Sequence, residues 1–509
     1  MYTVLTLASL PARLNTMRTS LWLDEAWVAN SILAPSWKEM FYYPRWLQPT
    51  PPLFLALARL LAKVLGPSEP ALRLMPVLFG LMAIPILAIA LRKLFGTGAA
   101  LCGTSFVIVN LWVVRYAQQV KQFSADIFAS ALLLFLIVKY CRRPDRRNFT
   151  LLVVGFVVVS FLSTTAFFMG PSVIAAIAFG PLWRVSSYVQ ARRLKIAVVS
   201  LILFGALNYV VFIRPNRNSS LLAYWADRCL DPGHPFASAR DLFVSVAEVL
   251  VPQTFPATFY LGAAIVLFMI AGIVIVLIGA AAGSRKAVVV LLLGPLPFAV
   301  AIGFSLLGLY PLLRSPRMLL WALPGCAALL AATVDQLWTT FAQGAMQWNQ
   351  APIFYSIAVA CAFAALALNL AVVRYPRLNE QNSEAMHLLQ RSIGPSDSLY
   401  VHGFMLQQYD YYSRLMGWAP RRVYVGNVDL PCCSRNGTNP LNSTSQSYAA
   451  DLRLAAAQVQ PSGQLWMFLP SHLQVSKIVA TPELMQLEAC HETHREGFDL
   501  ALVLAYKCR

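Results

Sequence analysis

The chain has 509 residues, of which 58% are hydrophobic and only 12% are charged, and its mean hydropathy is +0.60. In soluble globular proteins, about a quarter of the residues are charged. The composition therefore indicates a polytopic membrane protein whose partner is the lipid bilayer. The net charge of +18 comes without a basic stretch interleaved with stacking aromatic residues, so we expect no nucleic-acid partner.

Long apolar runs predict the membrane-spanning helices. The first apolar segment, 2–14, is shorter than the ~20 residues that a span needs, so it is either a shortened first helix or continues upstream. The later runs are 74–91, 98–114, 125–139, 150–170, 171–183, 196–213, 258–282, 287–309, 317–337 and 353–373. Together they predict about eleven transmembrane helices, an all-α membrane domain over 1–375.

The apolar run 51–66 is ambiguous because it contains Arg59 and Lys63. If it lies in the interface and does not span, the loops LRKLFG, KYCRRPDRR, WRVSSYVQARRLK and GSRK fall inside, with thirteen Lys or Arg residues. The short outer turns near 112–124 and 309–317 then hold only four. The positive-inside rule favours this arrangement, so we predict an interfacial helix in the first outer loop.

The tail, 376–509, has a different composition. Short apolar runs such as SLYVHGF, QLWMFLP and LALVLAY alternate with helical and turn segments, which predicts an extracytoplasmic α/β domain. An oxidising exterior would permit a disulfide there. The candidate cysteines are Cys432, Cys433, Cys490 and Cys508 of the tail and Cys229 of an outer loop.

The stretch SLWLDEAWV, 20–28, places Asp24 and Glu25 just after the first apolar segment. Residues 1–373 hold only eleven acids, so each one at a membrane boundary is informative. The pair could simply cap the interface beside the belt residues Trp22 and Trp27. The functional alternative is a general base or a cation-binding carboxylate in an outward cavity.

Two further outer stretches are rich in polar residues. The turn VVRYAQQVKQFSADIFAS, 113–130, includes Gln119, Lys121 and Asp126, an expensive set at a membrane boundary unless it faces a polar cavity. The stretch YPLLRSPRMLLWALP, 310–324, includes Arg314 and Arg317, which are either interfacial anchors or a clamp for a lipid phosphate. Acids and cations on one face suggest a reaction on a lipid phosphate at the outer leaflet.

Five motifs occur in an order that resembles a known family: SLWLDEAW, QPTPPLFLAL, LGPSEPALRLMPVLFG, RYAQQVKQFSADIF and LRSPRMLLWALP. The chain is similar to polytopic glycosyltransferases of the GT-C superfamily, in the bacterial branch related to protein mannosyltransferases and lipid A aminoarabinose transferases. The resemblance covers roughly the first 330 residues and implies sugar transfer from a polyprenyl-phosphate donor to an acceptor outside the cytoplasm. That acceptor is a glycan, a lipid or a protein.

The resemblance implies a role for Asp24, and we assign hypothetical roles to the other polar residues. Asp24 holds the position of the family's acidic residue, which serves as base or acceptor-positioning group. We expect Asp24 to be the general base and the anomeric centre to invert. Glu25, Gln119 and Asp126 would position acceptor or donor, with Glu25 alternatively orienting Asp24. The donor phosphate would be bound by Lys121, Arg314 and Arg317.

Two departures from the family pattern matter. Thr50 stands where members often have His or Lys before the Pro-Pro, and Gln118-Gln119 stands where many have Gln-Glu. The missing Glu weakens the prediction of a metal site. No cofactor is required by this scheme, and participation of a divalent cation is left open.

Two alternatives differ in function. A lipid-linked glycan polymerase or ligase would share the membrane architecture and use a diphosphate donor. A transporter or flippase would need charged residues at mid-membrane, whereas the polar groups here gather on one face. We therefore expect an enzyme of the inner (plasma) membrane, multi-pass, with its active site and tail on the periplasmic side.

Overall fold

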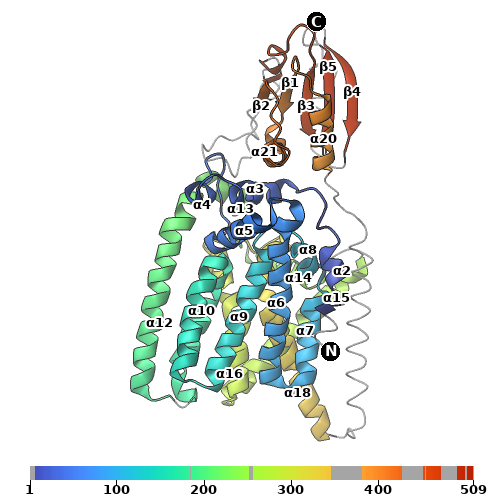
Figure 1. Cartoon of the computed structure of the whole chain (residues 1–509). Helices are drawn as coiled ribbons and strands as arrows, with labels where there is room; N and C mark the ends of the chain where they lie inside the picture. Colours follow the sequence, from blue (N-terminus) through green and yellow to red (C-terminus); the bar gives the residue numbers. More distant parts are fainter. Residues whose placement is uncertain are drawn as a thin grey trace.

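The structure is a computed structural model of the chain that describes residues 6–7, 9–183, 185–251, 256–344, 381–426, 451–452, 454–471, 490–498 and 501–507. A helical bundle carries a small sheet domain over one of its ends (Figure 1). In the described part of the chain, six helical segments are long and apolar enough to cross a membrane. They are Glu69–Phe95, Phe123–Arg142, Ser187–Asn216, Thr258–Ala281, Arg285–Leu306 and Pro316–Thr339.

The predicted class, a membrane all-α bundle with a sheet-containing tail, is confirmed. Each of the six segments overlaps a predicted run. The count of about eleven spans stays a prediction, because 353–373 lies outside the described residues. The first apolar segment contains the short helix α2 (Leu10–Leu14) and is not among the six.

Some predicted spans are broken into shorter helices. The run 98–114 divides into α7 (Thr97–Val109) and α8 (Leu111–Tyr116) at Asn110. The Asn110 side chain accepts a hydrogen bond from the Val113 amide at 3.1 Å and donates to the Val249 carbonyl at 2.8 Å. It thereby caps the new helix and fixes its direction. The runs 150–170 and 171–183 become four helices: α10 (Arg146–Leu162), η1 (Thr164–Met169), α11 (Gly170–Ala178) and η2 (Gly180–Trp183).

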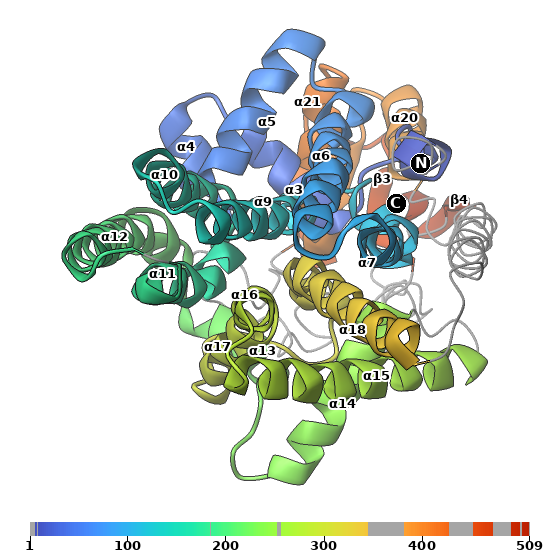
Figure 2. The same cartoon turned by 90° about the horizontal axis from the view of Figure 1, so that it is seen from below.

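The bundle packs around one enclosed helix. In Figure 2, α6 (Glu69–Phe95), α9 (Phe123–Arg142) and α18 (Leu323–Gly344) lie toward the middle, whereas α12 (Ser187–Asn208) lies at one edge. The most apolar part of α9 is 78% buried, against 11% for the segment that contains α12. Thus α9 is a scaffold for its neighbours, and α12 presents its apolar side chains to lipid.

The short basic loops lie at the end of the bundle opposite the sheet domain. Helix α5 (Pro52–Leu65) lies with α3 (Leu23–Ile32) and α4 (Trp37–Phe41) at the end that carries the sheet domain (Figure 1). As expected, α5 is not a candidate span. The α9–α10 connection and the start of α12, both basic, lie at the opposite end. This separation agrees with the positive-inside pattern.

The segment between α12 and α15 (Pro256–Ala281) includes the α-helices α13 (Ser219–Ala226) and α14 (Pro235–Leu250), which lie on the sheet-domain half of the bundle. The chain then returns through α16 (Arg285–Leu293) and α17 (Pro295–Leu306). A turn connects α17 to η5 (Pro316–Ala322), which leads into α18. This turn contains Arg314, and Arg317 follows it at the start of η5.

The tail forms the expected α/β unit. Its five strands are β1 (Ser398–Val401), β2 (Val423–Val425), β3 (Leu465–Pro470), β4 (His491–Gly497) and β5 (Ala501–Lys507), in the order β2-β1-β3-β5-β4. Strand β1 pairs in parallel with β2 and β3, and β5 pairs antiparallel with β3 and β4. The helices α20 (Asn382–Ser392) and α21 (Leu406–Leu415) accompany the sheet. Cys490 takes part in a disulfide bond, whereas Cys229 is free.

The sheet domain packs directly on α3. The Leu21 amide donates to the Tyr412 hydroxyl at 2.7 Å, and the Asn30 side chain donates to the Gln407 carbonyl at 2.8 Å. These bonds hold both ends of α3 against α21. Because Asp24 lies on α3, the tail fixes the helix that carries the predicted base.

We predict that Gly103→Ala destabilises the bundle. A Cβ at this position of α7 would lie 2.5 Å from the Ala327 carbonyl oxygen of α18, a backbone atom that cannot rotate away. Overpacking of this kind costs about 1–3 kcal/mol, so thermal unfolding in detergent should begin at a lower temperature. The control is Gly303→Ala, whose Cβ meets no heavy atom within 4 Å. Equal unfolding midpoints for the two variants would contradict this packing.

Candidate active site

Asp24 and Arg317 form an ion pair, although they are far apart in sequence. The Asp24 Oδ2 lies 2.7 Å from Arg317 Nη1, and the two side chains are 21% and 19% exposed. Asp24 comes from the first turn of α3, where the helix dipole favours negative charge. Arg317 comes from the start of η5. The expectation that these residues share one side of the membrane is met.

Lys121 adds a second positive charge to this pair. Burial opposes ionisation of Asp24, but the charges of Lys121 and Arg317 outweigh it and lower the pKa of the carboxyl group. The pKa of Lys121 is itself lowered, first by burial and further by Arg317, with Asp24 opposing the shift. The three groups are therefore an electrostatic unit of one carboxylate and two cations.

Glu25 faces a different direction from Asp24, because adjacent helical residues point about 100° apart. Its carboxylate pairs with Arg73 of α6, with contacts of 2.6 Å to Nη2 and 2.8 Å to Nε. Both side chains are almost fully buried, at 2% and 3% exposure. Glu25 Oε1 also accepts a hydrogen bond from the Val120 amide at 2.8 Å, so the carboxylate holds the turn that carries Lys121.

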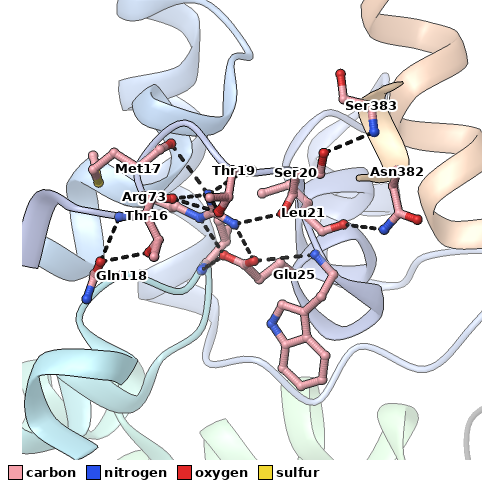
Figure 3. A network of polar contacts seen from close by, with 12 residues as sticks. Thr16, Met17, Thr19, Ser20, Leu21, Glu25, Arg73, Gln118, Asn382 and Ser383 are labelled. Carbon is pink, nitrogen blue, oxygen red and sulfur yellow. Dashed lines mark hydrogen bonds and ion pairs between the residues drawn. The ribbon is translucent and has the colours of Figure 1, made fainter. Parts of the chain in front are cut away.

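The Arg73 guanidinium holds a third segment in place (Figure 3). It donates at 2.6 Å to the carbonyl groups of Thr16 and Thr19, in the chain that leads into α3. Gln118 accepts hydrogen bonds from the amide and hydroxyl of Thr16 at 3.0 and 2.7 Å. The sequence interpretation missed Arg73. The signal available was a charged residue at the outer edge of a predicted span, inside the motif LGPSEPALRLMPVLFG.

Gln119 and Gln122 flank Lys121 and retain unused hydrogen-bonding capacity. Among the described residues, the buried side-chain oxygen of each has no partner. A buried acceptor without a donor costs free energy, which a ligand hydroxyl or amine would recover. The position of Gln119 suits the predicted role in substrate positioning.

Asp126 lies on α9, apart from the Asp24 pair. Its Oδ1 accepts a hydrogen bond from the Ser163 hydroxyl at 2.6 Å, and Ser163 lies 3.0 Å from the Thr165 hydroxyl. In the described ranges, no Lys or Arg forms an ion pair with this buried carboxylate. Asp126 is therefore a buried carboxylate among hydroxyl groups, and the structure does not join it to the Asp24 pair.

Arg314 points away from Asp24. It pairs with Asp241 of α14 at 2.6 Å, and its side chain is 61% exposed. Its backbone has φ of +56°, the left-handed region, which turns the chain between the two arginines. Arg314 lines a separate cavity of about 660 Å³ with Asp227, Asp231 and His234. The structure thus brings Asp24, Lys121 and Arg317 together and leaves Arg314 outside this group.

The donor set around Asp24 does not suit a metal ion. Within the described residues, no group of three or more His, Cys, Asp or Glu side chains is placed to hold one. The immediate neighbours of Asp24 are cations, which repel a divalent ion. We assign no metal to this site.

We predict that the Glu25–Arg73 pair is essential for stability. Removing one partner leaves an uncompensated buried charge, which costs about 3–5 kcal/mol. Glu25→Gln and Arg73→Met should therefore each lower the thermal unfolding midpoint strongly, and the double variant should lose less than the two single losses combined. Strictly additive losses would show that the two side chains do not interact. The surface variant Glu39→Gln is the control.

Comparison with known proteins gives one family match. Residues 49–209 match the family model described as dolichyl-phosphate-mannose-protein mannosyltransferase. No curated protein matches the chain by sequence.

Solved structures match along almost the whole chain. ArnT from Cupriavidus metallidurans, bound to undecaprenyl phosphate, superposes with a TM-score of 0.56 at 14% identity, covering 99% of this chain and 97% of ArnT. The apo state of ArnT gives a TM-score of 0.55. The Archaeoglobus fulgidus oligosaccharyltransferase in complex with Zn and sulfate gives 0.55 at 13% identity, covering 99% of this chain and 72% of that one.

The matches agree with the expected resemblance to membrane glycosyltransferases, in fold over almost the whole chain and in sequence over residues 49–209. The low identities establish a shared fold, while the family match rests on sequence. The chain therefore has the fold of GT-C membrane glycosyltransferases and, over residues 49–209, the sequence pattern of the dolichyl-phosphate-mannose-protein mannosyltransferase family.

Proposed function

We propose that the chain transfers a sugar from a polyprenyl-phosphate donor to an extracytoplasmic acceptor with inversion at the anomeric carbon. The observation that carries this proposal is the 2.7 Å contact between Asp24 and Arg317. A carboxylate beside a phosphate-binding cation is what displacement at a sugar phosphate requires, since one accepts a proton and the other stabilises the leaving group. The match to ArnT bound to undecaprenyl phosphate supports a lipid-linked donor.

The reaction is a single displacement. An acceptor hydroxyl or amine attacks the anomeric carbon, and its proton passes to the Asp24 carboxylate. The bond from the anomeric carbon to the phosphate oxygen breaks on the opposite side, and its electron pair stays on the phosphate. Arg317 and Lys121 stabilise the added negative charge. The donor's phosphate ester supplies the energy, so no nucleotide is needed.

The ion pair between Asp24 and Arg317 predicts an order of substrate binding. While Arg317 contacts Asp24, it makes the carboxylate a weak base. In our proposal, the incoming donor phosphate takes over the Arg317 guanidinium, and Asp24 becomes free to accept a proton. A base that is released only when donor is bound favours binding of the donor before the acceptor.

The remaining predicted residues support this pair. Glu25 acts through Arg73 and Val120, so we assign it the positioning of Asp24 and of the Lys121 turn. The unpaired oxygen of Gln119 would accept a hydrogen bond from donor or acceptor. Asp126 would orient a substrate from α9. Arg314 receives no phosphate-binding role, because it faces Asp241.

We place the reaction at the extracytoplasmic face of an inner (plasma) membrane. The support is the position of the Asp24 site at the sheet-domain end of the bundle, opposite the basic loops. A glycan, a lipid or a protein remains the acceptor class, and the tail is well placed to select among them because it packs on α3.

A lipid-linked glycan ligase is the second candidate. The structural match to the oligosaccharyltransferase favours this candidate, because the match covers 99% of this chain. Purified protein supplied side by side with labelled sugars on polyprenyl monophosphate and on polyprenyl diphosphate separates the two. The proposal expects transfer from the monophosphate only.

We predict that Asp24→Asn abolishes transfer while retaining donor binding. Loss of a general base lowers kcat by about 10²–10⁴-fold, whereas the amide keeps the shape of the side chain. The measurement is single-turnover transfer from a labelled polyprenyl-phosphate sugar, with Asp227→Asn as the control. Transfer by Asp24→Asn at the wild-type rate would falsify the base assignment.

We predict that the acid limb of the pH–rate profile depends on Arg317. The pKa of Asp24 is lowered, so the basic form is present above that pKa and is lost as pH falls through it. Arg317→Gln removes one of the two lowering charges and should shift the acid limb to higher pH. Arg314→Gln should leave the limb where it is. An unshifted limb in Arg317→Gln means that another group controls it.

A further inference from the structure

The indole ring of Trp225 contacts two guanidinium groups. Arg317 approaches the ring centroid to 5.3 Å and Arg228 approaches it to 4.8 Å. Trp225 is on α13, and Arg228 follows that helix by two residues. The segment between α12 and α15 therefore reaches the same place as the turn that carries Arg317.

Arg228 is held by a backbone hydrogen bond to the turn before η5 and by aromatic rings of its own segment. Its carbonyl oxygen accepts a hydrogen bond from the Leu313 amide at 2.9 Å, and its guanidinium also lies 5.6 Å from the Tyr224 ring. Two aromatic rings and one backbone hydrogen bond thus limit where the side chain can go. Such restriction lowers the entropy cost of binding a ligand.

Around the Trp225 ring there is one more positive charge than there are paired acids. Arg317 has Asp24, but no ion pair joins Arg228 to an acid in the described residues. Two guanidinium groups that share one ring repel each other unless an anion lies near them. Planar guanidinium groups bind phosphate oxygens with two parallel hydrogen bonds, so a phosphate is the anion that fits this arrangement.

We infer that Arg228 is a second guanidinium ligand of the donor phosphate, and that Trp225 positions both Arg228 and Arg317 for it. This inference rests on the proposed function and names a residue outside the sequence-predicted set. Arg228 takes the part that the sequence interpretation gave to Arg314. The phosphate gains a second negative charge as the anomeric bond breaks, so a further cation stabilises the leaving group more than the intact donor.

The experiment measures equilibrium binding of undecaprenyl phosphate to the purified full chain in detergent. Arg228→Ala should weaken binding by about tenfold, the usual effect of losing one charged hydrogen-bonding partner. Arg228→Lys should recover part of the loss, because it keeps the charge without the planar geometry. Trp225→Ala should also weaken binding. The matched control is Arg240→Ala, an exposed arginine of the same segment that pairs with Asp241.

The outcomes separate this inference from the proposed function. If Arg317→Ala loses binding while Arg228→Ala and Arg228→Lys bind like wild type, Arg228 is not a ligand and the function still stands. If the wild type neither binds undecaprenyl phosphate nor transfers sugar from a polyprenyl phosphate, the proposed function fails. A thermal unfolding midpoint for each variant accompanies the binding data. If Arg228→Ala does not fold, the Arg228→Lys variant decides the question. A fully folded Arg228→Lys variant that binds undecaprenyl phosphate with wild-type affinity and an unchanged salt dependence overturns the bidentate assignment.

Discussion

The buried carboxylate of Glu25 determines the geometry of the candidate site. Both of its oxygens bind Arg73, and one of them also accepts a hydrogen bond from the Val120 amide. The carboxylate therefore joins α3, α6 and the turn before α9. A buried ion pair contributes little net stability compared with apolar packing, yet breaking it is costly. The pair is therefore better understood as a device that fixes position. As a result, Asp24 lies on one side of α3 and Lys121 on the adjacent turn, and both interact electrostatically with Arg317.

The sheet domain completes this arrangement from the other side. Tyr412 and Gln407 bind the two ends of α3, and the Tyr411 hydroxyl donates to the Pro67 carbonyl just before α6. The helix with the candidate base is thus held between the membrane bundle and the tail. Any movement of the tail would therefore reach Asp24 through α3.

The sequence predicted the features that depend on composition and charge. The polytopic class, the interfacial run 51–66 and the α/β tail follow from hydropathy, basic loops and alternating apolar runs. The two outer stretches that carry Lys121 and Arg317 were also identified, because charged residues at a membrane boundary are costly. Side-chain direction was not predictable. Asp24 and Glu25 are neighbours that face opposite partners, and Arg314 and Arg317 separate because the backbone at Arg314 adopts a positive φ.

Long-range partners also lay beyond the reach of sequence patterns. In the sequence, Arg73 and Arg228 look like ordinary cations at a membrane boundary. Only the structure shows that Arg73 contacts Glu25 and that Arg228 contacts Trp225. The break at Asn110 depends on carbonyl groups of residues 249 and 250, which no local pattern reveals.

The most direct test of the account is an experimental structure of the full chain with bound undecaprenyl phosphate. The account predicts that the phosphate lies within hydrogen-bonding distance of the Arg317 guanidinium, next to Lys121, and that the Asp24–Arg317 contact has opened. A phosphate bound instead beside Arg314 and Asp241, with the Asp24–Arg317 pair intact, would contradict it.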